Sequence, residues 1–233
     1  MGNRQNFSIE KYFVVGPENT LGRPVRQMME AVTAAGFTCI QLRSKVASAR
    51  EMLALARETA DVIAAAGKTE KITLLIDDRL DIALAAREMG IAVDGVHVGQ
   101  SDVPVAVCRK YLGNDAVIGL SAPTGELFDY LKTTDIHDID YFGAGPLRPT
   151  NTKPDCGLTS DGTIVTRSLE ELTALAKVSP LPIVVGGGVK QFDLPALKKT
   201  GIDGFFIVSA VSEAADPQAA ARALVQTWDQ AER

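Results

Sequence analysis

Eight short apolar segments alternate along the chain with segments of helical periodicity, and this alternation restricts the fold more than any other feature. Apolar residues recur every three or four positions most clearly from Met52 to Ala66. The predicted strands are Tyr12–Gly16, Cys39–Arg43, Ile72–Ile76, Gly95–Val98, Val117–Ser121, Tyr141–Gly145, Pro182–Val185 and Gly204–Val208. The other predicted helices span residues 24–36, 80–89, 103–111, 124–133, 168–178, 191–199 and 216–229. Strict alternation predicts parallel strands joined by helices, because a tight turn cannot connect parallel neighbours.

The length of the chain favours one of the two common folds of this kind. A (β/α)8 barrel usually has about 250 residues, which the 233 residues of this chain match, whereas a doubly wound sheet would normally use fewer strands. A nucleotide-binding fingerprint would favour the doubly wound sheet, but Gly143-Ala144-Gly145 is followed by Arg148 where a third glycine is required. We therefore predict an α/β protein with one (β/α)8 TIM barrel domain over residues 1–233, its barrel spanning residues 12–227 after a short polar lead-in.

Charge and cysteine content exclude several functional classes. The 24 Lys and Arg against 29 Asp and Glu leave a net charge of −5, so no overall basic surface is available for nucleic acid or an anionic membrane. No apolar run approaches the roughly 20 residues that cross a bilayer. Three widely spaced cysteines without a Cys-x-x-Cys pair argue against a disulfide framework or a zinc cluster and favour the cytoplasm. We expect small-molecule partners, and the sequence leaves a homo-oligomer open.

Cationic and amide side chains follow the second predicted strand on one face. The two-residue period of a strand points Gln41, Arg43 and Lys45 to the same side. A barrel strand presents one face to the interior, where an unpaired guanidinium is costly. We therefore interpret this set as functional rather than as a solvated strand end.

Carboxylates follow the next two strands. Asp77, Asp78 and Asp81 come after the third strand, and Asp102 comes after the fourth. One carboxylate of the first group could cap the next helix, and Asp102 could equally be an N-cap or a ligand. Paired carboxylates without a histidine cluster suit Mg²⁺, which often takes its other ligands from substrate phosphates. The accompanying cations favour a phosphate ligand over a sugar.

The later strands end in residues that suit an anion. Ser121 follows the fifth strand, and the long loop after the sixth contains Thr150-Asn151-Thr152-Lys153. Glycines 186–188 follow the seventh strand and Ser209-Ala210 the eighth, where many barrels bind phosphate through backbone amides. We interpret His97 as a hydrogen-bonded strand histidine rather than a catalytic base. All these groups fall at carboxyl ends of strands, the rim where barrel enzymes place catalysis.

Taken together, these motifs resemble the thiamine phosphate synthase family over residues 12–227. The glycine pairs are unspecific alone, whereas Gln-x-Arg-x-Lys, Gly-Gln-x-Asp and Thr-x-Thr-Lys are specific as a set. In order, the motifs are Gln41-Leu42-Arg43-x-Lys45, Asp78-Arg79, Val96-His97-Val98-Gly99-Gln100-x-Asp102, Gly143-x-Gly145-Pro146, Thr150-x-Thr152-Lys153, Gly187-Gly188 and Val208-Ser209-Ala210.

The resemblance implies a transferase of thiamine biosynthesis that reacts dissociatively with Mg²⁺. It would join 4-amino-2-methyl-5-pyrimidinylmethyl diphosphate to a thiazole phosphate, carboxylated or not, and release diphosphate. By position, the pyrimidine diphosphate would be held by Gln41, Arg43, Lys45, Ser121 and Lys153, the last four of these being catalytic. Asp78 and Asp102 would bind Mg²⁺, and the thiazole phosphate would lie among Thr150, Asn151, Thr152, Gly188, Val208 and Ser209. Leu42, Ser44 and Asp77 complete the implied substrate site.

Two departures from the family pattern carry consequences. The family usually has Asn where this chain has Asp77, and a carboxylate beside a diphosphate would repel it unless it accepts from the pyrimidine amino group, sits on Mg²⁺ or is protonated. Extra residues around 88–93 are expected to lengthen a turn on the opposite rim. Two alternatives remain, a thiazole tautomerase-like isomerase and a non-catalytic thiamine-phosphate binder.

Overall fold

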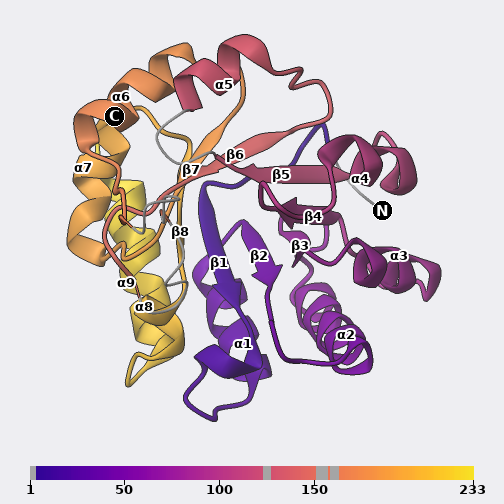
Figure 1. Cartoon of the computed structure of the whole chain (residues 1–233). Helices are drawn as coiled ribbons and strands as arrows, with labels where there is room; N and C mark the ends of the chain where they lie inside the picture. The colour runs from indigo at the N-terminus through magenta and orange to yellow at the C-terminus, as the bar shows by residue number, and fades with distance from the viewer. Residues whose placement is uncertain (1–3, 123–126, 151–156, 158–162) are drawn as a thin grey trace.

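The computed structural model describes residues 4–122, 127–150, 157 and 163–233, and it confirms the predicted (β/α)8 barrel. Eight parallel strands pair in chain order, and β8 closes on β1 (Figure 1). The strands are β1 Lys11–Val15, β2 Cys39–Leu42, β3 Thr73–Asp77, β4 Gly95–Val98, β5 Val117–Ser121, β6 Tyr141–Ala144, β7 Ile183–Val185 and β8 Gly204–Ile207. Each end lies within one residue of its predicted position.

Helices cover the outside of the barrel (Figure 1). They are α1 Val25–Ala35, α2 Ala49–Ala65, α3 Leu80–Glu88, α4 Val105–Leu112, α5 Leu127–Thr133, α6 Leu169–Val178, α7 Leu194–Lys199, α8 Ser209–Ser212 and α9 Pro217–Gln230. Local chemistry sets their ends: a capping box between Ser48 and Glu51 begins α2, and Gly36 in the left-handed region ends α1. In the described part of the chain, none of the helices is both long and apolar enough to cross a membrane.

Three short elements were not predicted. A 3-10 turn, Pro17–Asn19, follows β1, and the predicted helix over 191–199 is divided into a 3-10 turn, Gln191–Asp193, and α7. The four-residue helix α8 follows β8 directly. Elements this short cannot show a periodic pattern of apolar residues, so their sequences carry little helical signal.

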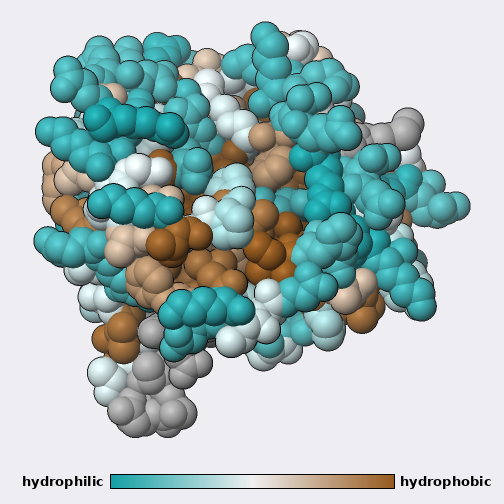
Figure 2. Space-filling view, turned by 90° about the horizontal axis from the view of Figure 1, so that it is seen from above, coloured by the Kyte–Doolittle hydropathy of each residue, from teal (hydrophilic) through white to brown (hydrophobic). Residues whose placement is uncertain are grey.

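Two separate apolar clusters hold the barrel. One fills the interior with inward-facing residues of the strands, namely Tyr12, Val14, Cys39, Leu75, Val117, Tyr141 and Val184, together with Ile9 just before β1. The larger cluster lies between the strands and the helices and includes Leu42 and Phe142. On the face drawn in Figure 2, hydrophilic side chains surround a central area of hydrophobic ones. Because successive side chains of a strand point to opposite faces, each strand contributes alternate residues to the inner and the outer cluster.

A repeated hydrogen bond ties the strands together at their amino ends. The residue just before each even-numbered strand accepts, through its side chain, a backbone N–H belonging to the preceding odd-numbered strand. The four bonds are Lys11 N to Thr38 Oγ1 at 3.1 Å, Leu74 N to Asp94 Oδ2 at 2.8 Å, Ile118 N to Asp140 Oδ2 at 2.7 Å and Ile183 N to Asp203 Oδ2 at 2.8 Å. This rim therefore stabilises the pairing of the strands.

We expect Asp203→Ala to lower the free energy of unfolding by about 1–3 kcal/mol, because the buried N–H of Ile183 loses its acceptor. Asp203→Asn keeps an acceptor oxygen and should lose less. Urea unfolding followed by circular dichroism measures both variants. Equal losses for Ala and Asn would contradict a role as acceptor.

Candidate active site at the carboxyl ends of the strands

The carboxyl ends of the strands enclose a cavity of about 410 Å³, a volume typical of small-ligand sites. Its walls come from strands and loops distributed around the barrel, because parallel strands bring all their carboxyl ends to one rim. The predicted residues that line it are Gln41, Arg43, Lys45, Asp77, Asp78, Asp102, Ser121, Thr150, Gly188, Val208 and Ser209.

The other predicted residues either do not line this cavity or lie outside the described residues. Leu42 is fully buried between the barrel and the helices, which leaves only its backbone for a ligand. Ser44 points its hydroxyl to Glu18, donating to Oε1 at 2.6 Å. Asn151, Thr152 and Lys153 lie outside the described residues.

Glu18, which the sequence analysis missed, holds the loop that presents Lys45. The same Oε1 that accepts from Ser44 accepts the backbone N–H of Lys45 at 3.1 Å. Burial alone would raise the pKa of Glu18, but the hydrogen bonds from Ser44 and from the backbone outweigh it and lower this pKa. Ser44 therefore supports the loop rather than facing the cavity.

Asp77 is held between a side chain of β2 and that of the residue directly after β2. Gln41 Nε2 donates to its Oδ1 at 2.9 Å, and Arg43 Nε lies 3.1 Å from its Oδ2. The Asp77 carboxylate is only 8% exposed. A buried carboxylate needs a charge partner, and Arg43 supplies it. The acid at this position is thus paired with a cation of the same cavity.

Asp78 directly follows Asp77, yet both line the cavity. Neighbouring residues of a regular strand point to opposite faces. Asp78 instead has a φ of 58°, in the left-handed region that Asp tolerates better than most residues, while its N–H still donates to His97 O at 2.8 Å. This turn of the backbone explains how consecutive carboxylates face one cavity. Asp81 pairs with Arg79 at 2.6 Å on the exposed side.

Asp78 and Asp102 form a close carboxyl pair. Lys45 Nζ donates to Asp78 Oδ2, and Asp102 Oδ2 accepts the Gly99 N–H at 2.8 Å. Burial, followed by the hydrogen bond with Asp78, raises the pKa of Asp102. The hydrogen bond to Asp78 likewise raises the pKa of Lys45.

The capping alternatives for these carboxylates were wrong. Helix α4 begins at Val105 after Pro104, with no side-chain cap, and Asp102 bonds Gly99 instead. Helix α3 begins after Arg79, again with no side-chain cap. The carboxyl groups of Asp78 and Asp102 are therefore directed to the cavity rather than to helix ends.

The residues present fit a magnesium ion. Two neighbouring carboxyl groups repel each other once ionised, as the raised pKa of Asp102 beside Asp78 reflects, and a divalent cation between them would relieve that repulsion. Their oxygens are the hard ligands that Mg²⁺ prefers. The described residues contain no group of three or more His, Cys, Asp or Glu placed to hold a metal, so an ion here would take its other ligands from substrate and water.

His97 is hydrogen-bonded through both ring nitrogens, as expected for a strand histidine. Nδ1 lies 2.9 Å from the Tyr141 hydroxyl, and Nε2 lies 3.0 Å from Ser121 Oγ. Gln100 Nε2 donates to the backbone oxygen of Ser121 at 2.7 Å. Ser121 is consequently held from two sides at the cavity wall.

The glycine turn after β7 is fastened to the loop after β6. Gly187 and Gly188 have φ of 77° and 73°, and a Cβ on Gly188 would lie 2.9 Å from Arg148 Cβ. Arg148 donates to Gly188 O at 3.2 Å and to both carboxylate oxygens of Asp193 at 2.5 Å. Sequence reasoning missed this role of Arg148, because an isolated arginine in a long loop carries no local signal.

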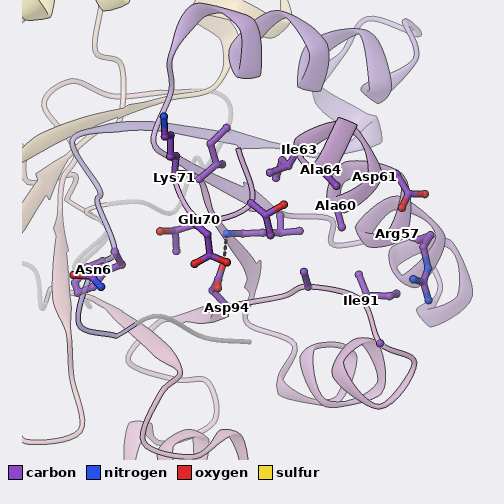
Figure 3. A pocket seen from close by; sticks show the side chains of 17 residues that line it. Asn6, Arg57, Ala60, Asp61, Ile63, Ala64, Glu70, Lys71, Ile91 and Asp94 are labelled. Atoms are coloured by element: carbon purple, nitrogen blue, oxygen red, sulfur yellow. Dashed lines mark hydrogen bonds between the residues drawn. The ribbon is translucent and has the colours of Figure 1, made fainter. Parts of the chain in front are cut away.

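A second cavity of about 200 Å³ lies at the opposite rim, beside α2 (Figure 3). The turn around Gly90–Ala92 helps to line it, which agrees with the rim predicted for the extra residues. Its Asp94 already accepts the backbone N–H of Leu74. None of the predicted site residues lines it.

Comparisons with known proteins show which proteins this chain resembles. A family model described as thiamine monophosphate synthase matches residues 11–211. A thiamine-phosphate synthase of Corynebacterium efficiens is 42% identical over 214 residues, which cover 92% of each chain. One from Moorella thermoacetica is 36% identical over 213 residues, covering 91% of this chain and 92% of the relative.

Solved structures show the same fold. Thiamine phosphate pyrophosphorylase from Pyrococcus furiosus superimposes with a TM-score of 0.75 at 26% identity, covering 97% of this chain and 98% of the other. Orotidine 5'-phosphate decarboxylase from Pyrococcus horikoshii reaches a TM-score of 0.60 at 13% identity over 93% of this chain and 99% of the other. At 13% identity, the second comparison shows only that the two proteins share the barrel fold.

We expect Gly188→Ala to destabilise the protein more than Gly67→Ala does. Both glycines have positive φ, which costs another residue about 1–2 kcal/mol. A Cβ on Gly67 meets nothing within 4 Å, whereas one on Gly188 meets Arg148. Urea unfolding compares the two, and equal losses would contradict a tight contact at this cavity wall.

Proposed function

The chain belongs to the thiamine monophosphate synthase family, and we propose which of its side chains carry that family's reaction. The reaction joins a pyrimidinylmethyl diphosphate to a thiazole phosphate, giving thiamine phosphate and diphosphate. The observation that supports the proposal best is that two cations and two neighbouring carboxyl groups, from the segments just after β2, β3 and β4, border one cavity. Diphosphate transfer needs both kinds of group.

Arg43 and Lys45 would stabilise the leaving group. The bond that breaks joins the pyrimidinylmethyl carbon to a diphosphate oxygen, which departs with the electron pair. Negative charge therefore grows on the diphosphate, where fixed cations lower the energy of the transition state. Arg43 is paired with Asp77 and Lys45 with Asp78, so both are already held at the cavity. Lys153 stays assigned to the same role from the sequence.

Asp78 and Asp102 would hold Mg²⁺ at the same place. When bound, Mg²⁺ would neutralise part of the diphosphate charge. Lys45 would then exchange its contact with Asp78 for one with a diphosphate oxygen. Ser121 would add a neutral hydrogen bond from the opposite wall, where His97 holds it at 3.0 Å.

The protein contributes position rather than a nucleophile. The electron-rich aminopyrimidine can support a methylene cation, which the thiazole nitrogen attacks with its lone pair to form the new C–N bond. Gln41 and Asp77, fixed to each other at 2.9 Å, would orient the pyrimidine. Holding two substrates in register and excluding water can supply about 7–11 kcal/mol at best.

Gly188, Val208 and Ser209 would receive the thiazole phosphate, with Thr150 beside them. Positive φ at Gly187 and Gly188 lets backbone amides approach phosphate oxygens without a Cβ in the way. Asn151 and Thr152 keep the same assignment from the sequence. Loops after the last two strands of a barrel commonly bind phosphate in this way.

We further infer a cytoplasmic setting for this small-molecule chemistry. Among the described residues, Cys39 and Cys108 are buried free thiols, which suits a reducing compartment.

Asp78→Asn is expected to lower kcat/KM by about 100-fold or more, because a metal ligand beside the leaving group is lost. Asp81→Asn is the matched control, since this carboxylate pairs with Arg79 outside the cavity. Conversion of the product to fluorescent thiochrome measures the rate with both substrates and Mg²⁺. EDTA should abolish the wild-type signal, and excess Mg²⁺ should restore it.

Equal rates for Asp78→Asn and Asp81→Asn would refute the metal assignment. Product formed at the wild-type rate by Arg43→Ala would refute the role of Arg43 in holding diphosphate.

Asp77→Asn is expected to lower the KM for the pyrimidine diphosphate about fivefold, the equivalent of about 1 kcal/mol. The change removes a negative charge beside the diphosphate and releases Arg43 from its ion pair. Steady-state kinetics with Mg²⁺ titrated measures it. A raised KM would mean instead that the Asp77 charge helps to bind the substrate.

A further inference from the structure

A continuous line of hydrogen bonds runs from the buried centre of the barrel to the cavity. The Tyr12 and Tyr141 hydroxyls are 2.9 Å apart, and Tyr141 lies 2.9 Å from His97 Nδ1. His97 Nε2 lies 3.0 Å from Ser121 Oγ, which borders the cavity. Four strands, β1, β6, β4 and β5, therefore contribute one side chain each to a single connected path.

A glycine makes this path possible. His97, Gly119 and Tyr141 stand at the same level on three adjacent strands. A Cβ on Gly119 would lie 2.3 Å from the Tyr141 hydroxyl oxygen and 2.5 Å from His97 Nδ1. The two side chains meet across β5 because that position has no side chain of its own.

Burial keeps the inner groups protonated. Tyr12 is 2% exposed and Tyr141 is fully buried, and burial raises the pKa of each hydroxyl well above its ordinary value. Cys39 is likewise buried, and burial raises the pKa of its thiol well above the usual range. Each of these groups therefore carries a hydrogen that it can donate.

The hydrogen bonds of this path can all donate towards the cavity or all donate away from it, because each hydroxyl has only one hydrogen. Outward, Tyr12 donates to Tyr141 and Tyr141 donates to His97 Nδ1, so both hydroxyl hydrogens meet strong acceptors. Inward, every bond reverses, and the last hydroxyl, on Tyr12, must donate to the Cys39 sulfur. Sulfur is a weak acceptor, so the outward direction satisfies the buried groups better.

We propose that Tyr12 and Tyr141 are positioning residues that hold His97 with its proton on Nε2, so that Ser121 accepts from His97 and donates its own hydrogen into the cavity. The inference rests on the proposed function, which puts an anionic diphosphate beside Ser121. A serine that donated to His97 would turn only lone pairs towards the anion and would repel it. The buried path thus decides whether Ser121 binds a diphosphate oxygen.

The kinetics of a double-mutant cycle test whether Tyr141 acts on the reaction through Ser121. Tyr141→Phe should lower kcat/KM for the pyrimidine diphosphate about fivefold to tenfold, the size of one neutral hydrogen bond. In a Ser121→Ala background the same change should have almost no effect, because the group through which it acts is gone. Tyr130→Phe, on outer helix α5, is the matched control and should leave the rate unchanged. Equal effects of Tyr141→Phe in both backgrounds would show a general structural role and overturn the proposal.

Nitrogen-15 NMR of histidine-labelled protein tests the tautomer without any substrate. The chain has two histidines, and His137→Gln removes the second signal. We expect the wild-type His97 spectrum to show the proton on Nε2, and we expect Tyr141→Phe and Tyr12→Phe to shift it towards a mixture. A proton on Nδ1 in the wild type overturns the proposal.

The two measurements separate the two hypotheses. If Nε2 carries the proton but Ser121→Ala turns over at the wild-type rate, the assignment of Ser121 to diphosphate is the part that fails. If either tyrosine variant fails to fold, the other variant and the wild-type spectrum still decide the tautomer.

Discussion

Closure of the eight strands directs every inward-facing side chain into one narrow column, and the rest of the structure depends on this constraint. Polar groups in such a column cannot reach bulk water and must bond to one another. Gln41 and Arg43 accordingly bind Asp77. Tyr141 is hydrogen-bonded to Tyr12 on one side and to His97 on the other. The column is apolar near the amino ends and increasingly polar towards the cavity, so the barrel delivers a prepared set of groups to one rim.

Most charges of the site are paired within it before any ligand binds. Arg43 is paired with Asp77 and Lys45 with Asp78, while the third carboxyl group, Asp102, accepts the Gly99 N–H. The rim thus combines cations for a diphosphate with carboxylates for a metal. Bound substrate and metal would replace these ion pairs: the cations would contact the diphosphate, and the carboxylates would contact the metal. A net charge of −5 on the whole chain therefore places no limit on binding an anion at this rim.

The two rims of the barrel have different roles: the amino-end rim stabilises strand pairing, and the carboxyl-end rim forms the candidate site. At the amino ends, Thr38, Asp94, Asp140 and Asp203 each accept one backbone N–H and pair the strands. At the carboxyl ends, the side chains face a cavity, and the loops there are tied by contacts such as that of Arg148 with Asp193. The repeat of acceptors at the amino rim escaped sequence analysis, because single residues spaced 46 to 63 positions apart show no recognisable period.

The sequence by itself determined the order, type and ends of the strands, and it placed most of the site at one rim. These features follow from local periodicity and from the parallel connection of strands. Tertiary structure alone decided how the residues pair: Asp102 bonds Gly99 instead of capping a helix, Leu42 faces the outer core, and a left-handed residue turns Asp78 to the cavity beside Asp77. Partners across a barrel depend on register and on the space that residues such as Gly119 leave, and neither is encoded within a single segment.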